Sequence, residues 1–313
     1  MAALTIRHTT SYTYRRPVAF GAHRVMVRPR DSADQRVLEA SLHISPTPSR
    51  IDWDKDGFGN HFAVVHFDRK AEQLRFESIV HVDHSPDEFA DLKGNAAKGL
   101  AAIYTAEERA KLAHFLQRRH PDTNGALSRW VSQFLAKHYP ADIRDLLIKM
   151  TFAIKQGFTY EVREAKGIQT PAQTLGLRGG TCRDFAVLMI EALRSLGVAA
   201  RFVSGYVHVR NDPGKPRSGG STHAWLQAYV PGAGWIDFDP TNGITGNRDL
   251  IRVAVVCDPI DALPLHGTWF GESSDALGMA VEVSVTSAET RFFVGAGYYS
   301  TRPERTATLH MMV

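Results

Sequence analysis

Three residues of the kinds used in thiol catalysis stand in the order Cys182, His223 and Asp239. The cysteine lies in a glycine-rich turn, Arg178-Gly-Gly-Thr-Cys-Arg-Asp-Phe-Ala186, that leads directly into an apolar helical pattern. A thiol at a helix N-terminus feels the positive end of the helix dipole and unpaired backbone N–H groups, which favour the thiolate. The same N–H groups could stabilise an oxyanion, so we predict that Cys182 is a nucleophile and not a cysteine that only packs in the hydrophobic core.

The histidine and the acid are predicted to meet across a β-hairpin. His223 opens the strand pattern His223-Ala-Trp-Leu-Gln-Ala-Tyr229, and Asp239 closes the next pattern, Gly234–Asp239. The tight connection at 231–234 places His223 either directly opposite Asp239 or one position diagonal to it. At that separation a carboxylate can hold one imidazole nitrogen and leave the other facing the thiol.

A second acid, Asp237, competes for this position. It lies two residues before Asp239 and shares its strand face, so alternation alone cannot exclude it. The hairpin register places Asp237 nearer Gln227 and farther from His223, which favours Asp239 as the residue that orients the imidazole.

Hydrophobic patterning indicates which elements would carry these residues. Residues 4–84 are rich in strand-forming side chains separated by turn clusters, and they predict a small antiparallel sandwich. The cluster at 52–60, rich in Asp, Gly and Asn, is interpreted as a turn. The strands expected here are Leu4–Tyr14, Arg36–Ser45, His61–Phe67 and Leu74–Val82.

The remainder of the chain mixes helices with strands. Apolar residues at i, i+3, i+4 and i+7 predict helices over Ala126–Ala136 and Asp142–Ile154. A further helix, Asp184–Leu196, ends at Gly197, as helices commonly do. The strands expected after it are Ala200–Val209, Thr222–Val230, Gly234–Asp239, Ile251–Val256 and Met279–Thr286.

Several segments resemble the transglutaminase-like superfamily, most closely its bacterial branch of transglutaminase-like enzymes and candidate cysteine proteases. The segments that resemble the core are Gly180-Thr-Cys-Arg-Asp-Phe-Ala186, Phe202-Val-Ser-Gly-Tyr206, Thr222-His-Ala-Trp225 and Gly234-Trp-Ile-Asp-Phe-Asp-Pro-Thr-Asn-Gly243. On the flanks, Thr10–Tyr14 and Asp56–Asn60 resemble the N-terminal region of that branch, and 252–255 and 281–285 resemble its closing segments.

The resemblance implies an α+β fold. Its core would be papain- and transglutaminase-like, with the nucleophile helix packed on an antiparallel sheet, and an antiparallel β-sandwich-like domain would precede it. The expected divisions are a β-rich N-terminal domain at 1–84, a helical connector at 85–150, the catalytic core at 151–250, closing β segments at 251–290 and an unassigned tail at 291–313.

Family roles transfer to matching positions. The resemblance implies that Cys182 is the nucleophile, that His223 is the general base and acid, and that Asp239, just before Pro-Thr, orients the imidazole. Tyr160 resembles an aromatic that assists the oxyanion, although a core aromatic is an equal alternative. The residues implied for the substrate groove are Gly180, Thr181, Arg183 (where the branch usually has Gln) and Trp225.

These roles imply an enzyme that attacks the amide bonds of peptides or proteins through a thioester. Resolution by water would make it a peptidase or amidase, which the resemblance favours. Resolution by an amine would make it a protein-glutamine transglutaminase. A binding module that keeps the fold without turnover is the third alternative.

No cofactor or metal site is predicted. His81 and His84 lack the i, i+4 helical spacing of a metal-binding helix. The segment Asp52–Gly57 begins like a calcium-binding loop, but Ala63 occupies the twelfth position, where such a loop needs glutamate.

Composition and charge exclude further classes. The 37 Lys and Arg residues and 33 Asp and Glu residues give a net charge of only +4, without the concentrated basic face of a nucleic-acid-binding protein. No stretch approaches the ~20 apolar residues that span a bilayer, and the first residues lack the apolar run of a secretory signal. We therefore expect a cytoplasmic protein without nucleic-acid or membrane partners, with both cysteines reduced. The oligomeric state is left open.

Overall fold

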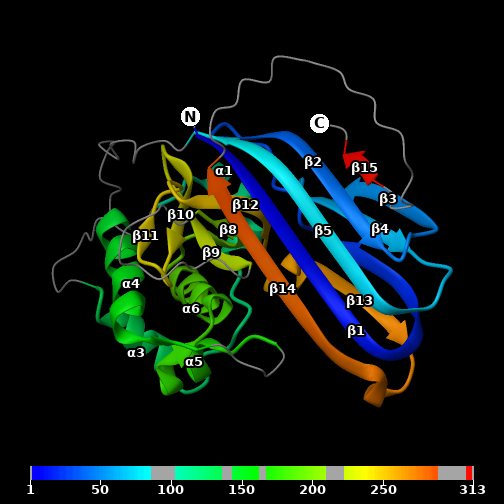
Figure 1. The fold of residues 1–313 in the computed structure, drawn as a ribbon. Coiled ribbons are helices and arrows are strands. Elements are labelled where there is room, and N and C mark those ends of the chain that lie inside the picture. Colours follow the sequence, from blue (N-terminus) through cyan, green and yellow to red (C-terminus); the bar gives the residue numbers. More distant parts are fainter. Residues whose placement is uncertain are drawn as a thin grey trace.

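The fold combines an antiparallel β region with a core of helices and a second sheet (Figure 1). This computed structural model describes residues 2–85, 103–135, 143–161, 167–208, 222–287 and 308–311. The predicted α+β class is confirmed. The predicted element ends at Ala136, Asp142 and Val209 and most of the 291–313 segment lie outside the described residues.

The β region is organised around β1 (Ala2–Val25), a long strand that takes part in two pairings along its length. Its first half pairs with β5 and β14 on either side, and its second half pairs with β4 and β13. The strand order is β15-β2-β5-β1-β4-β3, with β13 and β14 joined to β1. The other bounds are β2 (Gln35–Ser45), β3 (Arg50–Lys55), β4 (His61–His66), β5 (Ala71–His84), β13 (Leu265–Phe270), β14 (Ala276–Ser287) and β15 (Thr308–Met311).

Side chains from the two halves of β1 pack into a shared apolar interior. The rings of His23 and Phe76 lie 5.8 Å apart, and those of Tyr14 and Trp269 lie 5.1 Å apart. The two strands expected near the end of the chain belong to different sheets, because β14 pairs with β1 whereas β12 joins the second sheet.

One strand in this region corrects the sequence interpretation. β3 runs through 52–55, where a turn was predicted, and the turn is confined to 56–60. Five of its six residues are exposed and the sixth, Ile51, is half-buried, so the segment shows no apolar alternation. β3 is an edge strand that pairs only with β4, and charged side chains are usual on such an edge.

The core is a five-stranded antiparallel sheet packed against helix α6 (Cys182–Ser195). The sheet order is β11-β10-β9-β8-β12, with bounds β8 (Ala200–Val207), β9 (His223–Val230), β10 (Gly234–Asp239), β11 (Ile244–Thr245) and β12 (Leu250–Val256). The remaining elements are α1 (Ala106–Lys111), α2 (Ala113–Leu116), α3 (Ala126–Ser132), α4 (Ile143–Gly157), α5 (Pro171–Leu177), the parallel pair β6 (Thr159–Tyr160) and β7 (Gly179–Gly180), and two 3₁₀ turns, Pro259–Ala262 and Ser273–Asp275. Within the described residues, no helix has the length and apolar character needed to cross a membrane.

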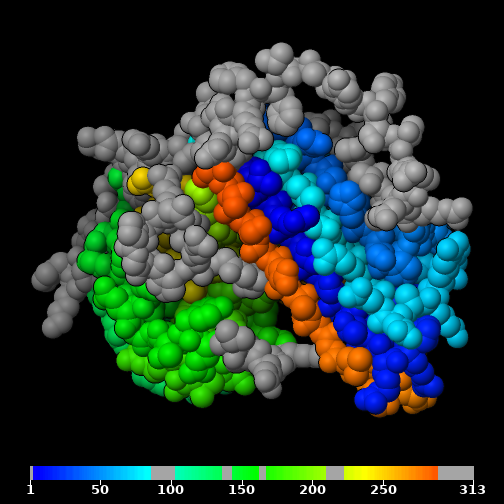
Figure 2. All heavy atoms as spheres, viewed as in Figure 1, coloured from blue at the N-terminus to red at the C-terminus, as the bar shows by residue number. Residues whose placement is uncertain are grey.

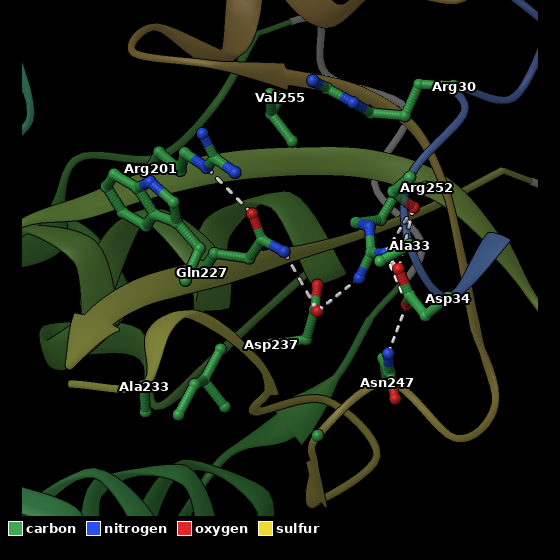
Figure 3. Close-up of a pocket in the computed structure, with 14 residues that line it drawn as sticks. Arg30, Ala33, Asp34, Arg201, Gln227, Ala233, Asp237, Asn247, Arg252 and Val255 are labelled. Atoms are coloured by element: carbon green, nitrogen blue, oxygen red, sulfur yellow. Dashed lines mark hydrogen bonds and ion pairs between the residues drawn. The ribbon is translucent and has the colours of Figure 1, made fainter. Parts of the chain in front are cut away.

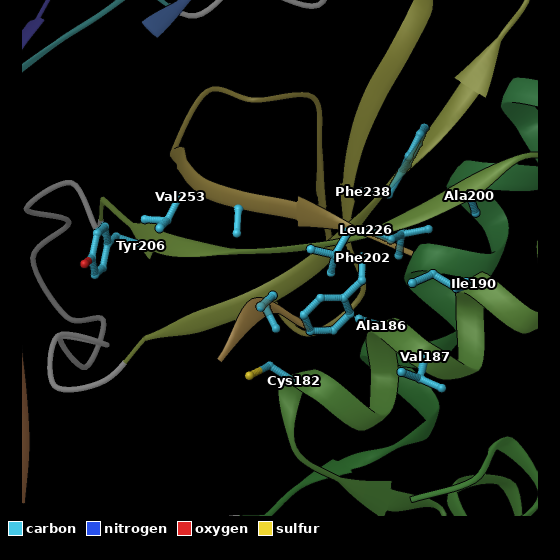
Figure 4. Packing of buried hydrophobic residues seen from close by; sticks show 14 of the residues in the cluster. Cys182, Ala186, Val187, Ile190, Ala200, Phe202, Tyr206, Leu226, Phe238 and Val253 are labelled. Carbon is cyan, nitrogen blue, oxygen red and sulfur yellow. The ribbon is translucent and has the colours of Figure 1, made fainter. Parts of the chain in front are cut away.

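Both faces of the core sheet are covered. On one face Phe202 and Leu226 pack with Ala186 and Ile190 of α6 (Figure 4). On the other, which we call the outer face, the N-terminal β region contacts the sheet, and Asn60 donates a hydrogen bond to the Val255 carbonyl at 2.8 Å. Figure 2 shows the two parts lying against each other. Burial on both faces explains why β12 is apolar except for Arg252.

Candidate active site

Cys182 is the first residue of α6, two positions earlier than the sequence pattern indicated. The Asp184 carboxylate fixes this helix start, because it accepts hydrogen bonds from the Thr181 N–H at 2.7 Å and the Thr181 hydroxyl at 2.9 Å. Its other oxygen accepts the Gln169 N–H at 2.7 Å. The cysteine is buried, and its sulfur points away from the apolar cluster behind it (Figure 4).

Local packing explains why glycine is present at position 180, just before the start of this helix. A Cβ on Gly180 would lie 2.9 Å from Cβ of Asp184 and 3.1 Å from Oε1 of Gln169, so a larger residue would disturb the contacts that hold the loop. Gly180 is buried and pairs with Tyr160 in the short β6–β7 ladder. The nucleophile loop is therefore tied to β6.

His223 and Asp239 meet across the β9–β10 hairpin. Nε2 of His223 lies 2.8 Å from Oδ2 of Asp239, which leaves Nδ1 for the thiol. Because Phe238 pairs with Leu226, the position opposite Asp239 is Trp225, and His223 lies diagonal to Asp239 at a separation of two residues, one more than predicted. Asp239 is fully buried, so its carboxylate depends on protein donors.

A residue that the sequence analysis did not single out completes this arrangement. Asn242 donates from Nδ2 to Oδ2 of Asp239 at 2.7 Å, and the same nitrogen lies 3.3 Å from Nε2 of His223. The backbone N–H groups of Thr241 and Asn242 donate to Oδ1 at 2.9 and 3.2 Å. An aspartate before a Pro-Thr-Asn turn commonly accepts such bonds, and this was the available signal.

Electrostatics favour the charged forms of the cluster. Burial raises the pKa of the Cys182 thiol, but the hydrogen bond and charge of His223 outweigh it, so the pKa lies below its ordinary value. Burial lowers the pKa of His223, yet the charge and hydrogen bond of Asp239 raise it to about 10. Burial raises the pKa of Asp239, and His223 more than compensates, so the net direction is downward. A thiolate, an imidazolium and a carboxylate are favoured together.

Asp237 serves a different network on the outer face of the sheet. It pairs with Gln227, as the hairpin register predicted. Its oxygens accept hydrogen bonds from Nε1 of Trp225 at 2.7 Å and Nε2 of Gln227 at 3.0 Å, and Arg252 forms an ion pair with it at 2.7 Å. No bond joins it to His223 within the described residues.

The predicted groove residues fall in different environments. Trp225 was expected to line the groove, but it is fully buried and its ring lies nearly parallel to that of His223, with centroids 6.0 Å apart. A ring without exposed surface cannot touch a substrate. Arg183 is half-buried, donates to the Pro259 carbonyl at 3.3 Å and contributes to the lowered pKa of Cys182. Tyr160 is half-exposed. Thr181 is the N-cap residue of α6, and its N–H donates to Asp184.

A helix that begins at a cysteine and packs on an antiparallel sheet, with His and Asp brought to its start, is the arrangement of a transglutaminase-like core. Residues 146–240 match the transglutaminase-like superfamily, and residues 4–83 match the bacterial transglutaminase-like N-terminal region. The chain belongs to the transglutaminase-like superfamily.

Individual proteins show the same relationship. An uncharacterized protein of Mycobacterium tuberculosis is 31% identical over 291 residues, which cover 90% of each chain. A protein-glutamine gamma-glutamyltransferase of Pseudomonas aeruginosa is 32% identical over 79 residues, 23% of this chain and 11% of that protein. The crystal structure of a “putative cysteine protease” from Cytophaga hutchinsonii has a TM-score of 0.67 at 21% identity, and the match covers 99% of this chain and 98% of that one. This last similarity concerns the fold.

Proposed function

We propose that the protein is a thiol enzyme that acts on amide bonds of peptides or proteins through a thioester. The observation that carries the proposal is the position of His223, hydrogen-bonded to Asp239 and close enough to Cys182 to lower the pKa of the thiol. Membership of a superfamily whose members typically use Cys, His and Asp supports it.

The chemistry follows from the three protonation states. The Cys182 thiolate attacks the carbonyl carbon and forms a C–S bond, and the His223 imidazolium gives its proton to the amine as the C–N bond breaks. The imidazole then takes a proton from the molecule that attacks the thioester. The Cys182 backbone N–H at the helix start is a donor for the oxyanion, and Tyr160 is a second candidate.

Hydrolysis is the favoured outcome, and transfer to an amine is the second candidate. The resemblance of both flanks and core to the bacterial branch that contains candidate cysteine proteases supports hydrolysis. The similarity of a 79-residue segment to a glutamyltransferase supports transfer. The proposed location is the cytoplasm, and the proposed substrate is a peptide or protein.

A peptide library with mass-spectrometric readout tests both outcomes. The wild type and Cys182→Ala are each incubated with the library, with and without a primary amine. Cleaved or deamidated peptides made only by the wild type support hydrolysis, and amine adducts on glutamine support transfer. If neither product forms and Cys182 alkylates no faster than Cys257, the protein is a binding module and the proposal fails.

A further inference from the structure

A polar cavity of about 360 Å³ lies on the outer face of the core sheet (Figure 3). Strands β8, β9, β10 and β12 form its floor, and segment 30–34 of the N-terminal region forms a wall. Its residue Gln227 lies four positions beyond His223 on β9, a separation of roughly 13 Å at 3.3 Å per residue. The cavity is therefore separate from the candidate active site, and its size suits a small ligand.

The charged residues of this cavity are three arginines and two aspartates: Arg30, Arg201, Arg252, Asp34 and Asp237. Arg252 forms ion pairs with both acids: its Nη1 lies 2.7 Å from Asp237, and its Nη2 pairs with Asp34. Trp225 and Gln227 donate to Asp237, and Asn247 and the Ser32 hydroxyl donate to Asp34. Both carboxylates are therefore bonded to several donors, and Arg201 and Arg30 are the two guanidinium groups that form no ion pair with either of them among the described residues.

Arg201 is the first of these two. Its Nε donates to Oε1 of Gln227 at 2.8 Å, and its guanidinium lies 4.1 Å from the centre of the Trp235 ring. Its terminal amino groups have no hydrogen-bond partner and no ion pair among the described residues. Burial, with the repulsion of Arg30 as the next cause, lowers the pKa of Arg201 to about 9. The side chain is thus held in place by Gln227 and the Trp235 ring, with Asp237 as a nearby opposite charge but no direct ion pair among the described residues.

Arg30 is the second. It donates to Oδ1 of Asn60 at 3.0 Å and to the Phe58 carbonyl at 3.2 Å, both neutral oxygens. A guanidinium has five N–H donors, so these bonds leave others available. In Figure 3 the Arg30 and Arg201 side chains lie in the upper part of the view, and dashed lines join Arg201 through Gln227 and Asp237 to Arg252, which lies below Arg30.

We propose that this cavity binds a carboxylate, held by Arg201 and Arg30. A guanidinium offers two parallel N–H groups that match the two oxygens of a carboxylate. The charge favours a single negative ligand, because the formal charge of the empty cavity is +1, three arginines against two aspartates. A phosphate dianion would exceed that charge and meet repulsion from Asp34 and Asp237. The ligand is a small organic acid or the carboxylate of a peptide.

Calorimetric titration of the folded protein tests this assignment. The probes are acetate, L-glutamate and inorganic phosphate at constant ionic strength, together with a short peptide bearing either a free or an amidated C-terminus. Peptides are titrated in the Cys182→Ala background so that they are not consumed. Saturable binding of acetate or glutamate identifies the ligand of the cavity as a small organic acid. The ligand is identified as the C-terminus of a peptide if the free-acid peptide binds more tightly than acetate and the amidated peptide does not bind.

Matched variants show whether the bound anion occupies this cavity. Arg201→Gln and Arg30→Gln should each weaken carboxylate binding about tenfold or more, a change of ~1.4 kcal/mol. Arg50→Gln, which removes an exposed arginine from the edge strand β3, should leave it unchanged. Because Arg201 forms no direct ion pair among the described residues, Arg201→Gln should change the melting temperature of the free protein little but lose its increase on adding glutamate. Absence of saturable binding, equal affinity in Arg201→Gln, or tighter binding of phosphate than of either acid would overturn the proposal.

Discussion

Replacing Asp239 with asparagine is the sharpest test of the proposed mechanism. The carboxylate accepts bonds from the imidazole, the Asn242 side chain and two backbone N–H groups, all of which are donors. An asparagine has only one acceptor oxygen, so its NH₂ must face a donor or force the imidazole into the other tautomer. In that tautomer Nδ1 carries the proton and cannot take one from the thiol. The same change in a serine triad costs about 10⁴ in turnover, and we expect a fall in kcat of about 10²–10⁴ here.

Asp237→Asn is the matched control, because it makes the same chemical change two residues away on the same strand. It should alter kcat by less than about tenfold, since Asp237 does not contact His223. It weakens the charge-assisted bond with Arg252, which is worth about 1.5–3 kcal/mol. At about 2–4 °C per kcal/mol for a large domain, the melting temperature should fall by roughly 3–12 °C.

The assay combines steady-state kinetics with alkylation of Cys182 across pH. Asp239 raises the pKa of His223, so its replacement should lower that pKa and reduce the thiolate fraction at neutral pH. The wild-type rate of alkylation at pH 7 should therefore exceed that of Asp239→Asn and match that of Asp237→Asn. Equal kinetic losses in the two variants, or a larger loss in Asp237→Asn, would show that the wrong carboxylate was chosen.

Four further results are expected. Cys182→Ala should abolish activity with little change in melting temperature, and more than a few per cent residual turnover would contradict a nucleophilic role. In the wild type, iodoacetamide should label Cys182 faster than Cys257 at pH 7, as read by peptide mass mapping, because burial raises the pKa of Cys257. Asn242→Ala should lower kcat by about tenfold and leave KM nearly constant, since it removes one bond to Asp239. EDTA should leave the rate intact, and loss of activity restored by calcium or zinc would show a metal requirement.

The hairpin was predictable because its register depends on few residues. A short connection between two strands fixes which residues pair across the hairpin. The observed pairs, Gly234 with Val230 and Asp237 with Gln227, agree with the register that this connection predicts. The start of α6 was similarly accessible, because a glycine-rich turn before an apolar helical pattern is a local signal. Local sequence signals are therefore sufficient to predict that Cys182, His223 and Asp239 lie together.

Features that depend on distant segments could not be predicted in this way. Trp225 was expected in a groove, yet the N-terminal region covers the outer face of the sheet and buries it. The cavity that contains Arg201 also needs segment 30–34, which lies far away in the chain and carries no pattern that relates it to β8 or β12. Strand β13 was missed because its six residues are exposed or half-buried, so it lacks the alternation of a half-buried strand.

The burial of Trp225 also bears on how the imidazole is oriented. Asp239 holds His223 through a hydrogen bond to one ring nitrogen, whereas Trp225 lies against the ring with an interplanar angle of 22°. The indole is itself fixed, because it has no exposed surface and its N–H is bonded to Asp237. The two aspartates of β10 therefore hold different side chains. Asp239 bonds the imidazole directly, whereas Asp237 bonds the indole and the side chains of Gln227 and Arg252, so replacing Asp237 should leave the protonation of His223 unchanged.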